Sequence, residues 1–150
     1  MIPSAYLDTS AFLRLFLQEV ESDVVAAAVQ GVTTLFASRL VLTEARVTLA
    51  RAQRDGRLSP QDYRVTLDAV DLFWEAEIEV VELTEESFIS AEHVAEIQTL
   101  RTLDALHLGT ARLLRKELAL TASIAFIACD NRLLQAAATL GFPTPIPPNP

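Results

Sequence analysis

The chain has 150 residues, of which 51% are hydrophobic and 21% are charged, so we expect one globular domain and exclude disorder over most of the length. Twelve Lys and Arg against twenty Asp and Glu give a formal net charge of −8, which argues against a nucleic-acid partner if the charge is spread evenly. Residues 65–100, however, hold ten of the acids and neither Lys nor Arg. The excess negative charge is therefore local, and it predicts where nucleic acid should not bind.

The single cysteine and the N-terminal sequence indicate a soluble cytoplasmic protein. Cys129 cannot form a disulfide within the chain, which is typical of a reducing compartment. The first residues carry no basic cluster, and Asp8 comes too early for a secretory signal. The most apolar uncharged run, residues 118–129, is too short to cross a bilayer, so we expect no membrane contact.

Hydrophobic periodicity and cap residues divide the chain into strands and helices. Gly is rare, and no Pro lies between Gln61 and Phe142, so long helices are expected. In chain order we expect a strand at 5–8, helices at 10–17 and 24–30, a strand at 33–37, helices at 38–55 and 59–74, a strand at 77–83, helices at 84–97 and 102–118, a strand at 124–129 and a helix at 131–140. This alternation predicts an α/β fold: a three-layer sandwich with a short, mostly parallel sheet flanked by helices. We expect a single domain over residues 1–142, followed by a Pro-rich extended tail at 143–150.

Two aspartates fall where the predicted strands end. Asp8 follows the first strand and Asp130 follows the last. Ligands of parallel sheets bind beyond the carboxyl ends of the strands, so both positions are candidates for a functional site. Each also precedes a helix, and Asp is a favoured helix N-cap, so capping is the simpler explanation of either residue alone.

Two further acids lie on mostly apolar helix faces. The neighbours of Glu44 at three and four residues are mainly Leu and Val, and Asp104 shares its face with Leu and Ala residues. A buried acid must be paired, protonated or bound to a metal. Ion pairs with Arg51 for Glu44, and with Arg101 or His107 for Asp104, are the alternatives to a metal site.

Together the four acids would require a cation. Carboxylates about 5 Å apart repel by about 3 kcal/mol per pair at an effective dielectric constant of about 20. Oxygen ligands without Cys or clustered His favour Mg²⁺ or Mn²⁺ over zinc. Such ions polarise phosphoryl oxygens and activate water, so the sequence is consistent with phosphodiester hydrolysis without a protein nucleophile.

The acids stand in short motifs that occur in a fixed order. These are Asp8-Thr9-Ser10, Leu42-Thr43-Glu44-Ala45-Arg46, Arg101-Thr102-Leu103-Asp104-Ala105-Leu106-His107, and Cys129-Asp130-Asn131-Arg132-Leu133 ahead of Leu140-Gly141. The series resembles PIN-domain ribonucleases, particularly the VapC-type toxins of bacterial toxin–antitoxin pairs, over residues 6–145. The resemblance implies an endoribonuclease dependent on Mg²⁺ or Mn²⁺, with an RNA substrate, a homodimeric assembly and a small antitoxin that blocks the site.

The resemblance also implies roles for single residues. The acidic quartet that binds metal and catalyses would be Asp8, Glu44, Asp104 and Asp130. Many relatives carry Thr two residues before the last of these acids, and here that position is Ala128. Thr9 and Ser10 would support the metal site, or they could cap a helix. His107 would contact RNA, or it could be packed inside. The candidates for binding substrate phosphates, which could also be ordinary surface charges, are Arg14, Arg39, Arg46 and Arg51.

Other functions account for fewer of these residues. A haloacid-dehalogenase-like phosphatase also begins with Asp8, but it needs a second Asp at position 10, which is Ser10, and a supported lysine, whereas Lys116 stands alone. A receiver-like domain fails for a similar reason. A non-catalytic PIN-like interaction module, in which the acids only pair with arginines, remains the alternative from a different class.

Overall fold

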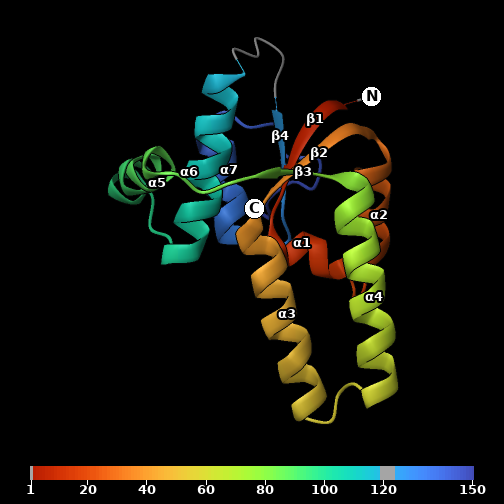
Figure 1. Ribbon diagram of the computed structural model, residues 1–150. Helices are drawn as coiled ribbons and strands as arrows, with labels where there is room; N and C mark the ends of the chain where they lie inside the picture. Colours follow the sequence, from red (N-terminus) through yellow and green to blue (C-terminus); the bar gives the residue numbers. More distant parts are fainter. Residues whose placement is uncertain (1, 119–123) are drawn as a thin grey trace.

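The computed structural model describes residues 2–118 and 124–150, and Figure 1 shows its arrangement. Within these residues the elements are, in chain order, β1 (Ile2–Leu7), α1 (Thr9–Arg14), α2 (Ser22–Gln30), β2 (Val32–Ser38), α3 (Arg39–Arg54), α4 (Pro60–Glu77), β3 (Ile78–Val81), α5 (Glu85–Ile97), α6 (Thr102–Glu117), β4 (Ile124–Ile127) and α7 (Asn131–Thr139). The predicted α/β class and the order of elements are confirmed.

The strands form one parallel sheet in the order β3-β2-β1-β4. Tyr6 in the central strand β1 is in register with Phe36 of β2 and Phe126 of β4. Because all the strands run the same way, their carboxyl ends lie at one edge of the sheet. The residues that follow β1 and β4 therefore come close to each other.

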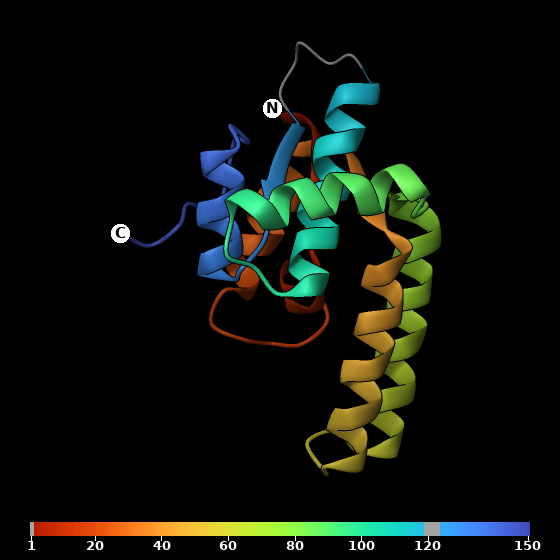
Figure 2. The same ribbon diagram turned by 90° about the vertical axis from the view of Figure 1, so that its left-hand side faces the viewer.

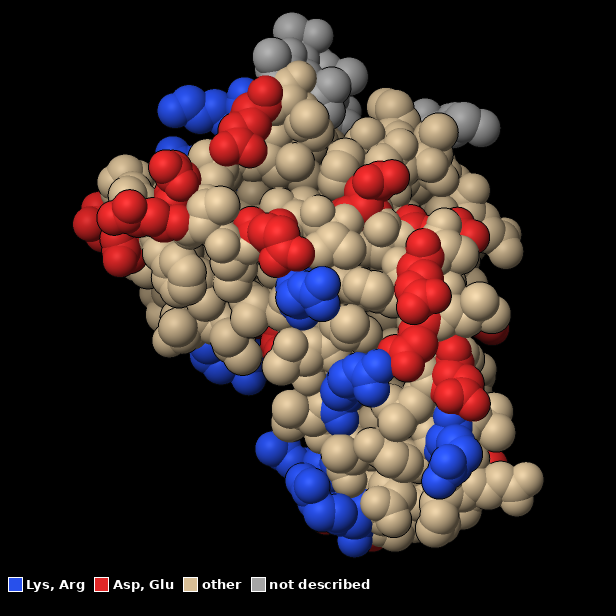
Figure 3. Space-filling view, in the orientation of Figure 1, with Lys and Arg blue, Asp and Glu red and all other residues tan. Residues whose placement is uncertain are grey.

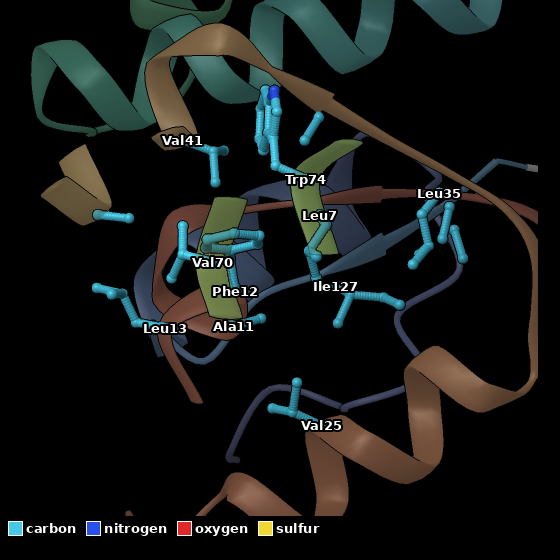
Figure 4. Close-up of a cluster of buried hydrophobic side chains, with 14 of the residues drawn as sticks. Leu7, Ala11, Phe12, Leu13, Val25, Leu35, Val41, Val70, Trp74 and Ile127 are labelled. Carbon is cyan, nitrogen blue, oxygen red and sulfur yellow. The ribbon is translucent and has the colours of Figure 1, made fainter. Parts of the chain in front are cut away.

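Alternation along β1 divides the interior into two cores. Ala5 and Leu7 face a core that α1 to α4 cover, where Phe12, Val70 and Trp74 pack together (Figure 4). This is the face built from the helices that follow β1 and β2.

Tyr6 points to the opposite core. It stacks on Phe126 with ring centroids 5.6 Å apart, and α6 and α7 cover this face. Outside α6 lies α5, and the two helices touch closely because Gly109 of α6 has no side chain where Ala91 of α5 approaches. Helices on both faces of the sheet give the predicted three layers, with α5 added outside.

The helices α3 and α4 form a hairpin that projects from the body, and we call these residues, 39–77, the arm (Figures 1 and 2). The sequence predicts its boundaries well: Ser38 and Ser59 cap the two helices, and Pro60 opens the second. The α4 helix runs to Glu77 instead of Trp74, because the Ile78 amide still donates to the carbonyl of Trp74.

The first helix is shorter than expected. Regular α-helix ends at Arg14 and a turn follows, whereas the apolar pattern predicts a helix to Leu17. Beyond Arg14 the amides of Leu15 and Phe16 donate three residues back, to Phe12 and Leu13. The Ser22 hydroxyl then donates to the Leu17 carbonyl and accepts from the Glu19 amide.

The C-terminal residues 143–150 form neither helix nor strand, and they lie against the domain. The amide of Phe126 donates to the Pro143 carbonyl at 2.8 Å, and the amide of Asn149 donates to Asn131 Oδ1 at 2.6 Å. Among the described residues no helix is long and apolar enough to cross a membrane. Residues 119–123 of the apolar run at 118–129 lie outside that part of the chain.

Candidate active site

The four predicted acids lie at the carboxyl edge of the sheet, each on a different element. Asp8 follows β1 and caps α1, and Asp130 follows β4 and caps α7. Glu44 lies in α3, and Asp104 lies in the first turn of α6. The fold therefore brings to one edge residues that are far apart in the chain.

Arg101 connects two of these acids. Its Nε donates to Asp104 Oδ2 at 3.1 Å, and its Nη2 lies 3.7 Å from Asp130 Oδ2. Burial raises the pKa of the Asp104 carboxyl above its ordinary value, Arg101 opposes this shift, and the charges of Asp8 and Asp130 add to it. The acids are thus close enough for one another's charges to matter.

His107 connects the other two acids. Its Nε2 lies 2.5 Å from Glu44 Oε1 and 3.7 Å from Asp8 Oδ1. Burial lowers the pKa of the imidazole, but the hydrogen bond to Glu44 and the charges of Asp8, Glu44 and Asp104 outweigh it, so the net pKa is raised. The ring is only 1% exposed, so it is packed and paired and does not present itself to solvent.

The two hydroxyls after Asp8 orient carboxylates. Ser10 Oγ donates to Asp8 Oδ2 at 2.6 Å and accepts from the Cys129 amide at 2.9 Å, which ties the ends of β1 and β4 together. Thr9 Oγ1 donates to Glu44 Oε1 at 2.9 Å. Neither side chain caps α1, because Asp8 accepts the Ser10 amide and serves as the cap itself.

Three of the four predicted substrate-binding arginines are engaged in ion pairs within the chain. Arg14 pairs with Glu19 and Glu21 at 3.0 and 3.2 Å. Arg39 lies 3.4 Å from Glu82, and Arg46 pairs with Asp71. Arg51 is exposed and forms no ion pair with any described residue, so of the four it is the one left available to a ligand.

Two cavities flank the contact between Arg101 and Asp104. One, of about 290 Å³, is lined by Glu44 and by residues 101–104. The other, of about 320 Å³, is lined by Arg101, Asp104 and residues 130–132. Glu44, Asp104 and Asp130 therefore border open space that a ligand can enter, with Arg101 between the two halves, whereas Asp8 is 3% exposed and lines neither cavity.

The four acidic side chains have the chemistry that a hard divalent cation requires. All four side chains offer carboxylate oxygens, the ligands that Mg²⁺ and Mn²⁺ prefer. As the side chains lie, no group of three or more His, Cys, Asp or Glu within the described residues is drawn together tightly enough to hold an ion. Arg101 is the positive charge between two of these acids, Asp104 and Asp130.

Two structurally informative residues were not singled out from the sequence. Tyr6 donates to or accepts from His107 across 101 positions of the chain, and nothing in a strand pattern signals such a pair. Arg101 was considered only as a partner for Asp104, and its second contact, with Asp130, depends on the fold.

The lysine needed by a phosphatase of the haloacid-dehalogenase type is also missing from the site. Lys116 lies near the far end of α6, about 18 Å along the helix from Asp104.

Comparison with known proteins decides the family. The sequence model of the PIN domain matches residues 5–138. The chain belongs to the PIN-domain family. Ribonuclease VapC47 of Mycobacterium tuberculosis (strain CDC 1551 / Oshkosh) is 32% identical to this PIN domain over 147 residues, which cover 95% of this chain and 96% of that protein.

Further PIN-domain relatives agree. Ribonuclease VapC45 from the same strain is 34% identical over 110 residues, covering 73% of this chain and 76% of the relative. A chain of a toxin–antitoxin complex from Klebsiella pneumoniae has the same fold, with a TM-score of 0.64 at 17% identity, and the match covers 96% of this chain and 99% of that one. PIN-domain nucleases of the VapC type generally depend on a divalent metal ion.

Proposed function

We propose that this PIN domain is a metal-dependent endoribonuclease and the toxin of a toxin–antitoxin pair. The observation that carries the proposal is the meeting of Asp8, Glu44, Asp104 and Asp130 from four elements at the carboxyl edge of the sheet. Relatives that match nearly the whole chain are named ribonucleases, which supports RNA as the substrate. Mg²⁺ or Mn²⁺ held by these acids would polarise the scissile phosphoryl group and lower the pKa of an attacking water.

The protein's own contribution is to orient the carboxylates before any ligand arrives. Asp8 has Oδ2 held by Ser10, Glu44 has Oε1 held by Thr9 and His107, and Asp130 has Oδ1 held by the Leu133 amide. In each case the hydrogen bonds go to one oxygen, and the second oxygen accepts no hydrogen bond from a described residue. Such support fixes the ligand geometry that metal binding needs.

RNA would reach this edge along the basic side of the arm. Arg51 follows Glu44 by two turns on the same face of α3, roughly 10 Å away, and Arg54 lies one turn further. In Figure 3 basic side chains follow α3 while acidic ones gather over the upper part of α4. We therefore assign the flanking RNA backbone to Arg51 and Arg54, and we place no RNA on the acidic residues 65–100.

We also propose a small antitoxin as partner and a homodimer as the assembly. A chain of similar fold comes from a toxin–antitoxin complex, which supports the first. The homodimer rests on the family resemblance. Light scattering of the purified chain, alone and after co-expression with the product of an adjacent small gene, tests both.

The decisive experiment compares the parent with Asp104→Asn. Induced expression in a bacterial host should arrest growth for the parent alone, and purified parent should cleave RNA with Mg²⁺ or Mn²⁺ and lose cleavage in a chelator.

The ion pairs of Arg101 with Asp104 and Asp130 favour a second candidate, the non-catalytic interaction module. Equal growth of both strains and metal-independent behaviour of both proteins would support that module.

A further inference from the structure

His107 is a buried polar residue that links three elements of the site. It lies on α6, one turn after Asp104, and its two ring nitrogens face opposite ways. Nδ1 lies 3.0 Å from the hydroxyl of Tyr6 in β1, and Nε2 lies 2.5 Å from Oε1 of Glu44 in α3. The ring therefore spans the distance from the sheet interior to one of the acids.

The inner end of this chain of contacts is fixed by packing. Tyr6 is fully buried, stacks on Phe126, and meets the imidazole edge-on with centroids 6.1 Å apart. A hydroxyl in the middle of a close-packed sheet has little freedom to move. Tyr6 thus holds the orientation of His107 from the side away from solvent.

The direction of the outer hydrogen bond follows from the chemistry of the acceptor. An ionised carboxylate only accepts, so Nε2 must carry the proton that it donates to Glu44. Thr9 donates to the same oxygen, and Thr9 Oγ1 lies 3.3 Å from Nε2 as well. All hydrogen bonds of Glu44 to the described residues go to Oε1, so Oε2 accepts none of them.

We propose that His107 is a positioning residue, which, anchored by Tyr6, locks the Glu44 carboxylate with one oxygen held and the other presented to the metal site. The proposal rests on the proposed function, because it gives Glu44 the role of a ligand. It differs from the expectation that His107 contacts RNA, since both ring nitrogens are occupied inside the protein.

The matched variants are His107→Leu, His107→Gln and Tyr6→Phe, made in the full chain and checked for folding by circular dichroism. Leu removes the donor to Glu44. Gln places an amide donor near the position of Nε2, and Tyr6→Phe removes only the hydroxyl that anchors the ring. If His107→Leu does not fold, the other two variants decide the question.

The first measurement is Mn²⁺ affinity by titration calorimetry without RNA. Loss of an outer-sphere partner typically costs 10- to 100-fold in metal affinity, so we expect His107→Leu to bind Mn²⁺ at least about 10-fold more weakly. His107→Gln should stay within about threefold of the parent, and Tyr6→Phe should lose about two- to tenfold, the worth of one hydrogen bond. Unchanged affinity in His107→Leu and Tyr6→Phe, or equal losses in Leu and Gln, would overturn the proposal.

The kinetic measurement separates positioning from RNA contact. A positioning role predicts a lower kcat with little change in KM, partly rescued in His107→Gln. A higher KM at unchanged kcat would instead assign His107 to RNA and contradict the proposal.

A long-range ¹H–¹⁵N NMR correlation of the imidazole needs neither metal nor RNA. It should show Nε2 protonated, with a shift that changes in Glu44→Gln. An imidazole protonated on Nδ1 alone would refute the arrangement. A parent that shows the expected imidazole signal but binds no Mn²⁺ would contradict the proposed function and leave the Glu44 contact standing.

Discussion

The acids at the strand ends each have a capping role and a proposed metal-binding role, which substitution can separate. Asp8 accepts the amide of Ser10 as the N-cap of α1, and Asp130 accepts the amide of Leu133 as the cap of α7. Capping and metal binding were alternatives in the sequence. The structure shows that capping occupies one oxygen of each carboxylate, so it does not compete with a ligand role for the other.

The Asp8→Asn variant should therefore lose RNA cleavage and keep its stability. Asn is as good an N-cap as Asp, so the free energy of unfolding should change by less than about 1 kcal/mol. RNA cleavage should fall at least about 100-fold, because a neutral amide is a poor ligand for a hard cation. Thermal unfolding and a cleavage assay on the same preparations measure the two effects.

Ser59→Ala provides the reciprocal control. Ser59 caps α4 on the arm by accepting the Asp62 amide at 3.0 Å, so its loss should cost about 1 kcal/mol of stability with cleavage unchanged. An Asp8→Asn variant that cleaves like the parent would remove Asp8 from the catalytic set.

Arg101 lies between Asp104 and Asp130, so it should compete with a cation that binds these two acids. Its side chain is 75% exposed, so its ion pairs with Asp104 and Asp130 are worth little individually. We expect Arg101→Gln to bind Mn²⁺ about two- to fivefold more tightly in titration calorimetry without RNA. Arg112→Gln, three turns along the same helix, should bind as the parent does. Equal or weaker binding by Arg101→Gln would show that the arginine does not occupy the site.

At the scale of elements, the crossing of α5 over α6 depends on one glycine. A Cβ at Gly109 would lie 2.5 Å from the Cα and the amide nitrogen of Ala91, closer than atoms can approach. Helix propensity alone predicts that Ala stabilises this position by about 1 kcal/mol. The clash is with backbone, which cannot rotate away, so the steric effect should win.

We predict that Gly109→Ala destabilises the protein by about 1–3 kcal/mol in urea unfolding. The matched control is Gly31→Ala at the end of α2, where the nearest atom to a Cβ would be the Ala28 carbonyl oxygen at an ordinary 3.5 Å and φ is −80°. That variant should be unchanged or slightly more stable. A stabilised Gly109→Ala would mean that α5 and α6 do not pack as closely as the structure has them.

For the whole molecule, the net charge of −8 conceals a division between the two helices of the arm. Residues 65–100, which hold ten acids, form most of α4 together with β3 and α5, whereas α3 carries Arg39, Arg46, Arg51 and Arg54. Ion pairs neutralise the first two of these arginines. The basic surface that remains is the far half of α3, on the same face as Glu44.

Charge reversal tests this path for RNA. Arg51→Glu should weaken RNA binding, raise KM several-fold and reduce the dependence of binding on salt, because a phosphate contact is lost. Arg64→Glu makes the same change in charge on α4, one turn from Asp68, and should have little effect. Binding by fluorescence anisotropy at several salt concentrations distinguishes the two, and equal effects would point to net charge alone.

The sequence by itself determined the parallel α/β plan and identified the four acids as candidates, because these depend on local signals. Strands and helices follow from hydrophobic periodicity, α3 and α4 begin where Ser38, Ser59 and Pro60 predict, and Asp8 and Asp130 stand directly after strand patterns. Two helix ends differed from the prediction: α1 ends at Arg14, where the next amides donate three residues back, and α4 runs to Glu77, because the Ile78 amide still donates to Trp74.

Only the tertiary structure decided how the site is supported. Tyr6 and His107, Thr9 and Glu44, and Ser10 and Cys129 meet across long stretches of chain. The same is true of the ion pairs that occupy Arg39 and Arg46 and leave Arg51 exposed. The physical reason is that a hydrogen bond or ion pair depends on distance in space, which packing of the two cores sets, whereas residue type and spacing report only what is adjacent along one element.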